Sequence, residues 1–503
     1  MSNVKTIVLV MMENRSFDHL LGWMSLGPYG RRTDVDGLTG DIDVASRELT
    51  NLTYDNYGQK QRWRPYLLDR DIQLATDIPH SRSEIRQQMA FSTTIGDFAM
   101  NGFAQAYFDA NPGQRNGRPE SLGIFPPDLV PMTAFLARNY LVCDRWFSPI
   151  PTDTQPNRIM SLAGYTRVDY TASFIPDHDL VIDWCGRKGV RWRAYSSGFP
   201  FLALMRTARA LIDGDHFRTF GQLARDVQTE PDSEFPQFII VEPEYGDDPL
   251  ARHPNDNHPP LPMGGGEAFL SDVYRALISN PARWAETLLI VVYDEHGGLF
   301  DHVPPFTVTT RPPKDQGWRD ATPFTTSGLR VPAILVSPWV QRGGASHLLL
   351  DHTSILRFLA DTFDGGAPYS DEVAARHREA PLNSVGALLS ATPQVGIPAP
   401  PDLGHVNTVT FASPRVAATE SMRAFQQARK ELHAEAPGSL AVVHAESLFH
   451  LPVTPLGSDE LAIGSSAPEP SVPALTAAAV RKVPAKPRKR TKGTGRKART
   501  ARK

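Results

Sequence analysis

The chain has 503 residues, a formal net charge of −3, 41% hydrophobic residues and 21% charged residues. Such a chain can bury a sizeable core, in two or three average domains or in one large α/β domain. The two cysteines, Cys143 and Cys185, are too few for a disulfide framework and lie in no Cys- or His-based metal pattern, so we interpret both as ordinary thiols. The sequence contains no run of about 18 apolar residues, and it therefore predicts no membrane-spanning helix.

Short apolar runs along the chain predict buried strands. They cover Thr6 to Met12, Tyr140 to Cys143, Phe238 to Val241, Thr287 to Tyr293 and Val331 to Val336. Between them, apolar residues recur every three or four positions over Ser271 to Ser279 and Ser354 to Thr362, as in helices. Alternating strands and helices predict an α/β fold with a largely parallel central sheet sandwiched by helices.

Other segments fall outside this alternation. Residues 31–64 are polar and turn-rich, which predicts a surface excursion or a small hairpin. Residues 165–234 carry no usable motif, and by position we interpret them as a possible cap over a site. We expect one folded domain over residues 1–465, followed by a disordered basic tail over residues 466–503, where Ala, Pro, Ser, Lys and Arg dominate.

The charge is divided unequally between these two parts. Residues 481–503 contain twelve Lys or Arg and no Asp or Glu, which leaves 40 basic against 55 acidic residues in the rest. We interpret the tail as solvated, with peripheral contact to an anionic membrane or to nucleic acid as alternatives. Because the first predicted strand begins within a few residues of Met1, we expect no cleavable signal peptide and a cytoplasmic protein, free or peripheral to a membrane.

The first predicted strand is followed at once by Glu13-Asn14-Arg15-Ser16-Phe17-Asp18-His19. These seven residues combine acidic, amide, basic, hydroxyl and imidazole groups. In open α/β sheets, ligands bind in the crevice beyond the carboxyl ends of the strands. The cluster therefore predicts part of a site.

A second polar cluster runs from Pro149 to Arg158, after the strand that ends at Cys143. Pro156 suits the first turn of a helix, so we expect Thr154 just before a helix N-terminus. The free N–H groups there favour a bound phosphate, and a hydroxyl can act as a nucleophile when a metal or a base lowers its pKa. The alternative role for Thr154 is that of an N-cap.

A third cluster follows Tyr293 and reads Asp294-Glu295-His296-Gly297-Gly298-Leu299-Phe300-Asp301-His302-Val303. Two adjacent carboxylates on a loop with two glycines can point at one position in the crevice. Hard oxygen ligands of this kind suit Mg²⁺, Ca²⁺ or Mn²⁺. The alternative is a solvated acidic turn with a salt bridge. The three clusters together fit metal-assisted attack on a phosphorus atom, with cationic groups holding the non-bridging oxygens.

Four motifs resemble the bacterial and plant phosphoesterase family of non-specific phospholipases C and related acid phosphatases. They are ENRSFDH from Glu13, TxPNR from Thr154, DExxGxxDHV from Asp294 and GxRVPxxxxxP from Gly328. The resemblance covers residues 1 to about 360. It implies an alkaline-phosphatase-like α/β fold and a phosphoesterase domain over residues 1–465.

The resemblance also implies a chemistry. One divalent metal ion would be held by the residues that match Glu13, Asn14, Asp294 and Glu295. Thr154 would be the nucleophile and would form a phosphothreonine that water hydrolyses. The implied activity is that of a phospholipase C on a phospholipid or another phosphate ester, with an acid phosphatase as the alternative. A non-catalytic phospholipid- or phosphate-binding protein is the remoter alternative.

Further residues are expected around the phosphate. We expect His258 and His302 to be catalytic, His258 through phosphate binding or protonation of the leaving group. The residues expected to bind the phosphate or to support the metal ligands are His80, Arg158, Arg15, His19, Asp301 and His352. For the histidines, the alternative is a surface, capping or packing role.

Overall fold

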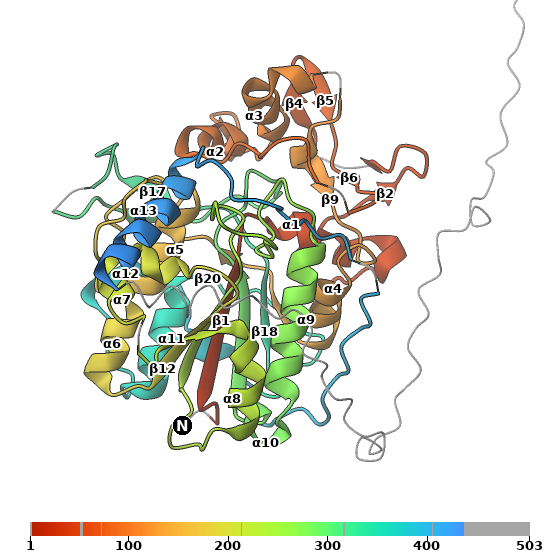
Figure 1. The fold of residues 1–503 in the computed structure, drawn as a ribbon. Coiled ribbons are helices and arrows are strands. Elements are labelled where there is room, and N and C mark those ends of the chain that lie inside the picture. Colours follow the sequence, from red (N-terminus) through yellow and green to blue (C-terminus); the bar gives the residue numbers. More distant parts are fainter. Residues whose placement is uncertain are drawn as a thin grey trace, which may run out of the picture. The chain divides into compact units, whose positions relative to one another are not determined.

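An eight-stranded sheet forms the centre of the protein (Figure 1). The computed structural model describes residues 3–436, apart from 51–53, 72, 116, 213, 315–316 and 405. The strand order is β13-β12-β14-β1-β15-β18-β10-β19. These strands are β1 (Thr6–Met12), β10 (Leu141–Cys143), β12 (Trp192–Ser196), β13 (Phe217–Thr219), β14 (Phe238–Glu242), β15 (Thr287–Tyr293), β18 (Ala333–Val336) and β19 (Ala345–Ser346).

Most neighbouring strands of the sheet are parallel, which confirms the predicted α/β class. β1 pairs in parallel with β14 on one side and with β15 on the other. Both β1 and β15 are buried throughout, and this explains their uninterrupted apolar sequences. β18 runs antiparallel to β15 and to β10. Its carboxyl end therefore lies at the opposite edge of the sheet from the ends of β1 and β15.

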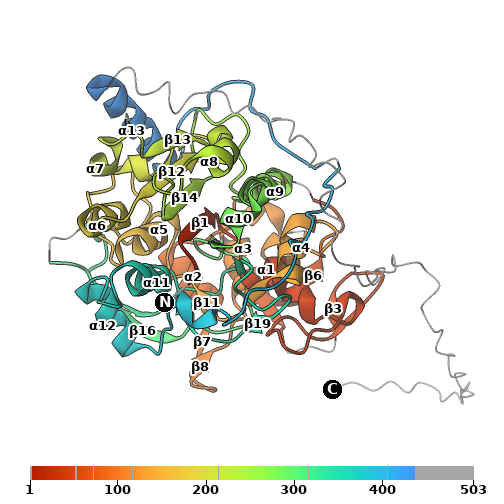
Figure 2. The same ribbon diagram turned by 90° about the horizontal axis from the view of Figure 1, so that it is seen from below.

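Helices cover both faces of the sheet (Figures 1 and 2). α4, α8, α9 and α10 pack together on one face, and α5, α6, α11 and α12 pack together on the other. The helices predicted from apolar spacing correspond to α9 and α11. The helices are α1 (Phe17–Leu21), α2 (Arg82–Met89), α3 (Phe103–Ala110), α4 (Pro131–Asn139), α5 (Thr154–Ala163), α6 (Val181–Lys188), α7 (Arg206–Arg209), α8 (Leu223–Thr229), α9 (Gly264–Ile278), α10 (Pro281–Trp284), α11 (Thr353–Phe363), α12 (Asp371–Glu379) and α13 (Glu420–Glu435).

Short strands outside the central sheet form two-stranded pairs. Residues 31–64 contain the pairs β2–β3 and β4–β5, which agrees with the predicted excursion. With α2 and α3, these elements lie beyond the carboxyl end of β1 (Figure 1). The short strands are β2 (Asp41–Ile42), β3 (Leu49–Thr50), β4 (Asn56–Gly58), β5 (Gln61–Trp63), β6 (Tyr66–Leu67), β7 (Phe91–Ser92), β8 (Asp97–Phe98), β9 (Gly123–Ile124), β11 (Trp146–Phe147), β16 (Thr307–Thr310), β17 (Phe324–Thr326) and β20 (Leu350–Asp351).

Part of residues 165–234 extends the central sheet, and a cap formed by the rest of this region stays a prediction. β12 pairs in parallel with β14, and β13 pairs with β12 at the edge. The sequence of β12 hides this role, since Arg193 interrupts its apolar pattern. The Arg193 guanidinium is neutralised by Glu230, at an Nη1–Oε2 distance of 2.7 Å. A charged residue can therefore occupy this buried strand.

Several expectations concern membranes, thiols and the tail. Among the described residues, no helix is long and apolar enough to cross a membrane. Cys143 and Cys185 are both free and buried, as expected. The tail over residues 466–503 lies outside the described residues, so its disorder and its partners stay predictions.

Candidate active site at the carboxyl ends of the strands

Two neighbouring strands bring the first and third polar clusters together. Met12 at the end of β1 is in register with Tyr293 at the end of β15. The residues that follow the two strands therefore lie side by side. The backbone N–H of Asn14 donates to Asp294 Oδ1 over 2.9 Å, although the two residues are 280 positions apart in the sequence.

Helix α5 brings a hydroxyl to the same place. The helix begins at Thr154, and Asp153 is the capping residue before it. Thr154 Oγ1 donates to Asn14 Oδ1 over 3.1 Å, and the residue is only 7% exposed. Thr154 is therefore one position further into the helix than an N-cap, and its hydroxyl contacts the first cluster at the positive end of the helix dipole.

Arg158, one turn along α5, joins the helix to the two strand ends. Its Nε lies 3.1 Å from Asp294 Oδ2 and 3.2 Å from Glu13 Oε1, and its Nη2 donates to two backbone carbonyls at the end of β1. Burial lowers the pKa of Arg158, but Tyr245, Glu13 and Asp294 outweigh this effect and raise the pKa above its ordinary value. The guanidinium therefore stays charged and fixes the orientation of both carboxylates.

At these strand ends, two buried carboxylate oxygens have no hydrogen-bond partner among the described residues. They are Glu13 Oε2 and Glu295 Oε1, and the two residues are 3% and 0% exposed. Burial raises the pKa of Glu13 well above its ordinary value, although Arg158 acts in the opposite direction. Buried anionic oxygens are unfavourable without a compensating cation. This oxygen-rich cluster, which includes Asp294 and the Asn14 amide, therefore fits a divalent cation.

The two glycines of the third cluster allow its loop to approach neighbouring backbone. Gly297 has φ +63°, and a Cβ atom there would lie 2.1 Å from the carbonyl oxygen of Asn14. Gly298 has φ +70°, and its Cβ would lie 2.3 Å from the carbonyl oxygen of Pro79. Asn14 itself has φ +57°, a conformation that Asn tolerates better than most residues.

Gly297→Ala is expected to destabilise the protein by about 3 kcal/mol, since it combines left-handed backbone strain with a clash against Asn14. Urea unfolding measures the change. Gly365→Ala is the matched control, because Gly365 also has positive φ but no heavy atom within 4 Å of its Cβ position. The control should lose only about 1 kcal/mol. Equal losses for the two variants would contradict the proposed close approach.

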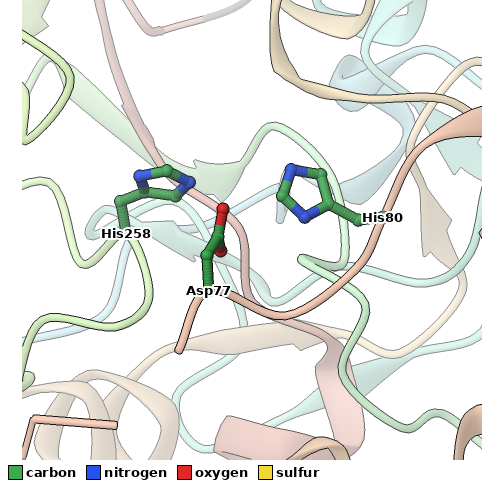
Figure 3. Close-up of side chains that lie close together, drawn as sticks. All are labelled: Asp77, His80 and His258. Carbon is green, nitrogen blue, oxygen red and sulfur yellow. The ribbon is translucent and has the colours of Figure 1, made fainter. Parts of the chain in front are cut away.

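His80 and His258 lie at the entrance to the cluster, with Asp77 between them (Figure 3). The two imidazole rings are 6.3 Å apart, and one ligand atom from each of the three residues lies within 4.8 Å of the others. His80 Nε2 is 3.3 Å from Asn14 Nδ2, and His258 Nδ1 is 4.0 Å from Glu13 Oε2. Burial lowers the pKa of His80, but the carboxylates around it, Glu295 first, raise that pKa to about 10. The structure thus brings both predicted histidines to the site.

Arg15 and His19 support the loop that carries His258. Arg15 Nε donates to the carbonyl of Asn257 over 2.7 Å, and Nη2 donates to the carbonyl of Leu261 over 3.0 Å. Arg15 Nη1 donates to His19 Nε2, since His19 Nδ1 donates to the Gly123 carbonyl. Burial and the neighbouring Arg15 lower the pKa of His19 well below its ordinary value, which keeps the ring neutral. Both residues therefore contact the segments next to the site, and their role in supporting the metal ligands stays a prediction.

His352 supports the site from behind. Its Nε2 donates to the carbonyl of Asp294 over 2.7 Å, and its Nδ1 accepts from Trp146 Nε1 over 3.1 Å. Burial lowers the pKa of His352 to about 4. A neutral ring with both nitrogens engaged positions Asp294 and offers no free atom to a substrate.

His302 and Asp301 belong to a second cluster that contains a buried arginine. His302 Nδ1 donates to Asp18 Oδ2 over 2.6 Å, and Nε2 donates to Asp36 Oδ1 over 3.2 Å. Arg330 lies 2.8 Å from Asp301 Oδ1 and 3.1 Å from Asp18 Oδ1. Asp18, Asp301 and His302 have the spacing of metal ligands, but the guanidinium already supplies a positive charge there. Among the described residues, His302 contacts Asp18 and Asp36 and makes no hydrogen bond to Thr154, so its catalytic role stays a prediction.

The charge of His302 should make the free energy of unfolding depend on pH. Burial lowers its pKa, but Asp18 and Asp36 raise it to about 9, above the value near 6.5 of an unfolded chain. A raised pKa stabilises the fold fully below about pH 6.5, and this contribution is lost as the pH rises through 9. The free-energy difference between the wild type and His302→Gln should therefore shrink by an amount of the order of 3 kcal/mol between pH 6 and pH 10. A difference that is constant over this range in urea unfolding would contradict the ion pairs.

Sequence reasoning missed several residues of these clusters. Asp77 is separated from His80 by two residues and carries no motif of its own. Tyr245 donates to Glu242 Oε2 over 3.1 Å and accepts from Arg158 Nη1 over 2.9 Å, so it fixes the arginine from the side of β14. Asp36 comes from the polar excursion. Asp18 and Arg330 had a usable signal, because they belong to the first and the fourth motif.

The fold and the site define a class of protein. It has an α/β sheet with a hydroxyl at a helix N-terminus and buried carboxylates at the strand ends, an arrangement suited to phosphoryl transfer. The chain belongs to the Phosphoesterase family, since a model of this family matches residues 4–364. Every residue placed in the site lies within that match.

Individual relatives agree with this membership. The chain is 33% identical to non-specific phospholipase C1 of Arabidopsis thaliana over 357 residues, which are 68% of this chain and 62% of the relative. It thus spans less than two thirds of that plant protein. It is 27% identical to phospholipase C B of Mycobacterium tuberculosis over 453 residues, which cover 80% of this chain and 81% of the relative. Among solved structures it is similar to murine ectonucleotide pyrophosphatase/phosphodiesterase 5, at 10% identity and a TM-score of 0.34, over 52% of this chain and 95% of that chain.

Proposed function

We propose that the protein is a metal-dependent phosphoester hydrolase of the phospholipase C type. The observation that supports this proposal most is the hydrogen bond from Thr154 to Asn14, next to the unpartnered oxygens of Glu13 and Glu295. A hydroxyl at a helix N-terminus beside such oxygens suits nucleophilic attack on phosphorus. The relatives named phospholipase C point to a phosphodiester as the substrate.

The proposed metal ligands are Glu13, Asn14, Asp294 and Glu295. Mg²⁺, Ca²⁺ and Mn²⁺ all suit carboxylate and amide oxygens. A bound divalent cation would lower the pKa of the hydroxyl and offset charge on the phosphate oxygens. Arg158 holds Glu13 and Asp294 in the orientation that this binding needs.

The reaction divides into two displacements at the phosphorus atom. In the first, Thr154 Oγ1, whose proton would be lost to solvent once a bound cation lowers its pKa, forms a bond to phosphorus, and the bond to the diacylglycerol oxygen breaks as this oxygen takes a proton from His258. In the second, a water oxygen displaces Thr154 and releases the phosphorylated head group. The positive end of the α5 dipole faces the phosphate in both steps.

His258 is the proposed proton donor for the leaving oxygen. Its ring lies at the entrance, and Arg15 fixes the backbone on each side of it. After donating its proton in the first displacement, the imidazole can accept one from the attacking water in the second. His80 is proposed to bind a non-bridging phosphate oxygen, since it lies next to Asn14 and faces His258.

The test is hydrolysis of phosphatidylcholine by the purified full chain, with and without a chelator. Equal release of phosphocholine and diacylglycerol that stops with chelator and returns with added Mg²⁺, Ca²⁺ or Mn²⁺ is the expected result. A simple aryl phosphate monoester is assayed in parallel. Cleavage of the monoester alone would replace the proposal by a phosphatase, and turnover of neither substrate would favour a non-catalytic binding protein.

A further inference from the structure

An exposed carboxylate stands at the entrance to the site. Asp77 lies between the rings of His80 and His258 (Figure 3), and no hydrogen bond joins it to another described residue. Its segment is nevertheless held in place. The carbonyl of Pro79 accepts from Gln88 Nε2 over 2.6 Å. The carboxylate therefore has a defined position, with the rings of His80 and His258 as its neighbours.

A short chain of contacts links Asp77 to the hydroxyl of Thr154. Thr154 Oγ1 is 3.1 Å from Asn14 Oδ1, and Asn14 Nδ2 is 3.3 Å from His80 Nε2. A ring nitrogen of His80 lies within 4.8 Å of an Asp77 oxygen. A phosphate that reacts with Thr154 and contacts His80 would thus lie within a few ångströms of the Asp77 charge.

The charge balance of the site makes this proximity important. The inner carboxylates Glu13 and Asp294 share Arg158, and the orphaned oxygens of Glu13 and Glu295 suit a metal ion. Asp77 shares no arginine with these residues. Its neighbouring charged group is His80, and Asp77 is exposed where the inner carboxylates are buried. Two like charges at about 6 Å repel by an amount that corresponds to roughly tenfold in affinity in a partly solvated site.

We propose that Asp77 selects substrates by charge. It disfavours phosphomonoesters, which carry two negative charges above about pH 7, relative to phosphodiesters, which carry one. It also attracts a cationic head group such as choline, whose positive charge is close to the phosphate. The inference rests on the proposed function and narrows its substrate class to phosphodiesters with a cationic head group.

The test compares two soluble substrates with the same leaving group at pH 8. They are p-nitrophenyl phosphorylcholine, a zwitterionic diester, and p-nitrophenyl phosphate, a dianionic monoester. Asp77→Asn should raise kcat/KM for the monoester about tenfold and lower kcat/KM for the diester about threefold. Asp77→Glu keeps the charge and should keep the preference for the diester. Asp97→Asn removes an exposed carboxylate from β8 and should change neither value.

Binding of inorganic phosphate provides a second readout that needs no turnover. Titration calorimetry at pH 8 should show phosphate binding about tenfold more tightly to Asp77→Asn than to the wild type. An unchanged substrate ratio and unchanged phosphate affinity would overturn the inference while leaving the proposed function intact. Equal loss of both activities together with loss of bound metal would also overturn it, because Asp77 would then be a metal ligand with His80 and His258. If the wild type hydrolyses neither ester, the proposed function fails and the phosphate titration still decides the role of Asp77.

Discussion

Thr154→Ala is expected to lower kcat for the phosphodiester by at least about 10³-fold, because it removes the atom that attacks phosphorus. The buried methyl group lost with the hydroxyl is small, and the hydrogen bond to Asn14 Oδ1 is a single one. The fold should therefore lose no more than about 1–2 kcal/mol of stability. Initial rates with the wild type and the variant at equal metal concentration measure the effect.

Thr154→Ser is the matched control, because it keeps a hydroxyl at the start of α5. It should retain activity within about tenfold of the wild type, since the attacking group is conserved. Rapid quenching of the wild type with a phosphorus-labelled diester should trap label on Thr154, whereas the alanine variant should carry none. Full activity of the alanine variant would show that water attacks the phosphate directly.

Glu13→Gln is expected to reduce activity about 10²-fold or more while stabilising the metal-free protein. The charge of Glu13 is buried, and its Oε2 has no partner among the described residues. An amide of the same shape removes the cost of this buried charge, and Arg158 keeps Asp294 as its partner. The expected gain is about 1–2 kcal/mol in chelator.

Added metal should stabilise the wild type more than it stabilises Glu13→Gln. A ligand that binds only the folded state at one hundred times its dissociation constant stabilises by about 2.7 kcal/mol. The wild type should show such a shift in urea unfolding when Mg²⁺, Ca²⁺ or Mn²⁺ replaces the chelator, and Glu13→Gln should lose most of it. Glu234→Gln, a substitution of an exposed glutamate, should behave as the wild type in both activity and metal response. A metal shift of equal size in Glu13→Gln would exclude this residue as a ligand.

The central part of the fold could be predicted because its strands are buried on both faces. β1 and β15 read as continuous apolar runs, and their predicted bounds agree with the structure. The antiparallel direction of β18 could not be predicted, because an apolar run shows that a strand is buried but not whether it pairs in parallel or antiparallel. β12 was missed because Arg193 breaks its pattern, and only the fold shows that Glu230 compensates the charge.

The site could be predicted where one motif places several groups on one strand end. Glu13, Asn14 and Asp294 follow buried strands directly, so their neighbourhood followed from parallel pairing. The separation of His302 from Thr154 was not evident, because it depends on Asp18 and Asp36, which come from the other motif and from the polar excursion. The proposed role of Asp77 could not be predicted from the sequence, because it depends on the position of His258, which is 181 residues further along the chain.

The position of β1 in the sheet has a consequence for synthesis of the chain. β1 is made first but lies between β14 and β15, whose residues 238–242 and 287–293 are translated much later. At about 5–20 residues per second, an apolar strand waits roughly 15–60 s on the ribosome for its second neighbour. During that interval it is a segment that aggregates readily or binds a chaperone, so the yield of folded enzyme should depend more on holdase capacity in the cell than on the stability of the finished sheet.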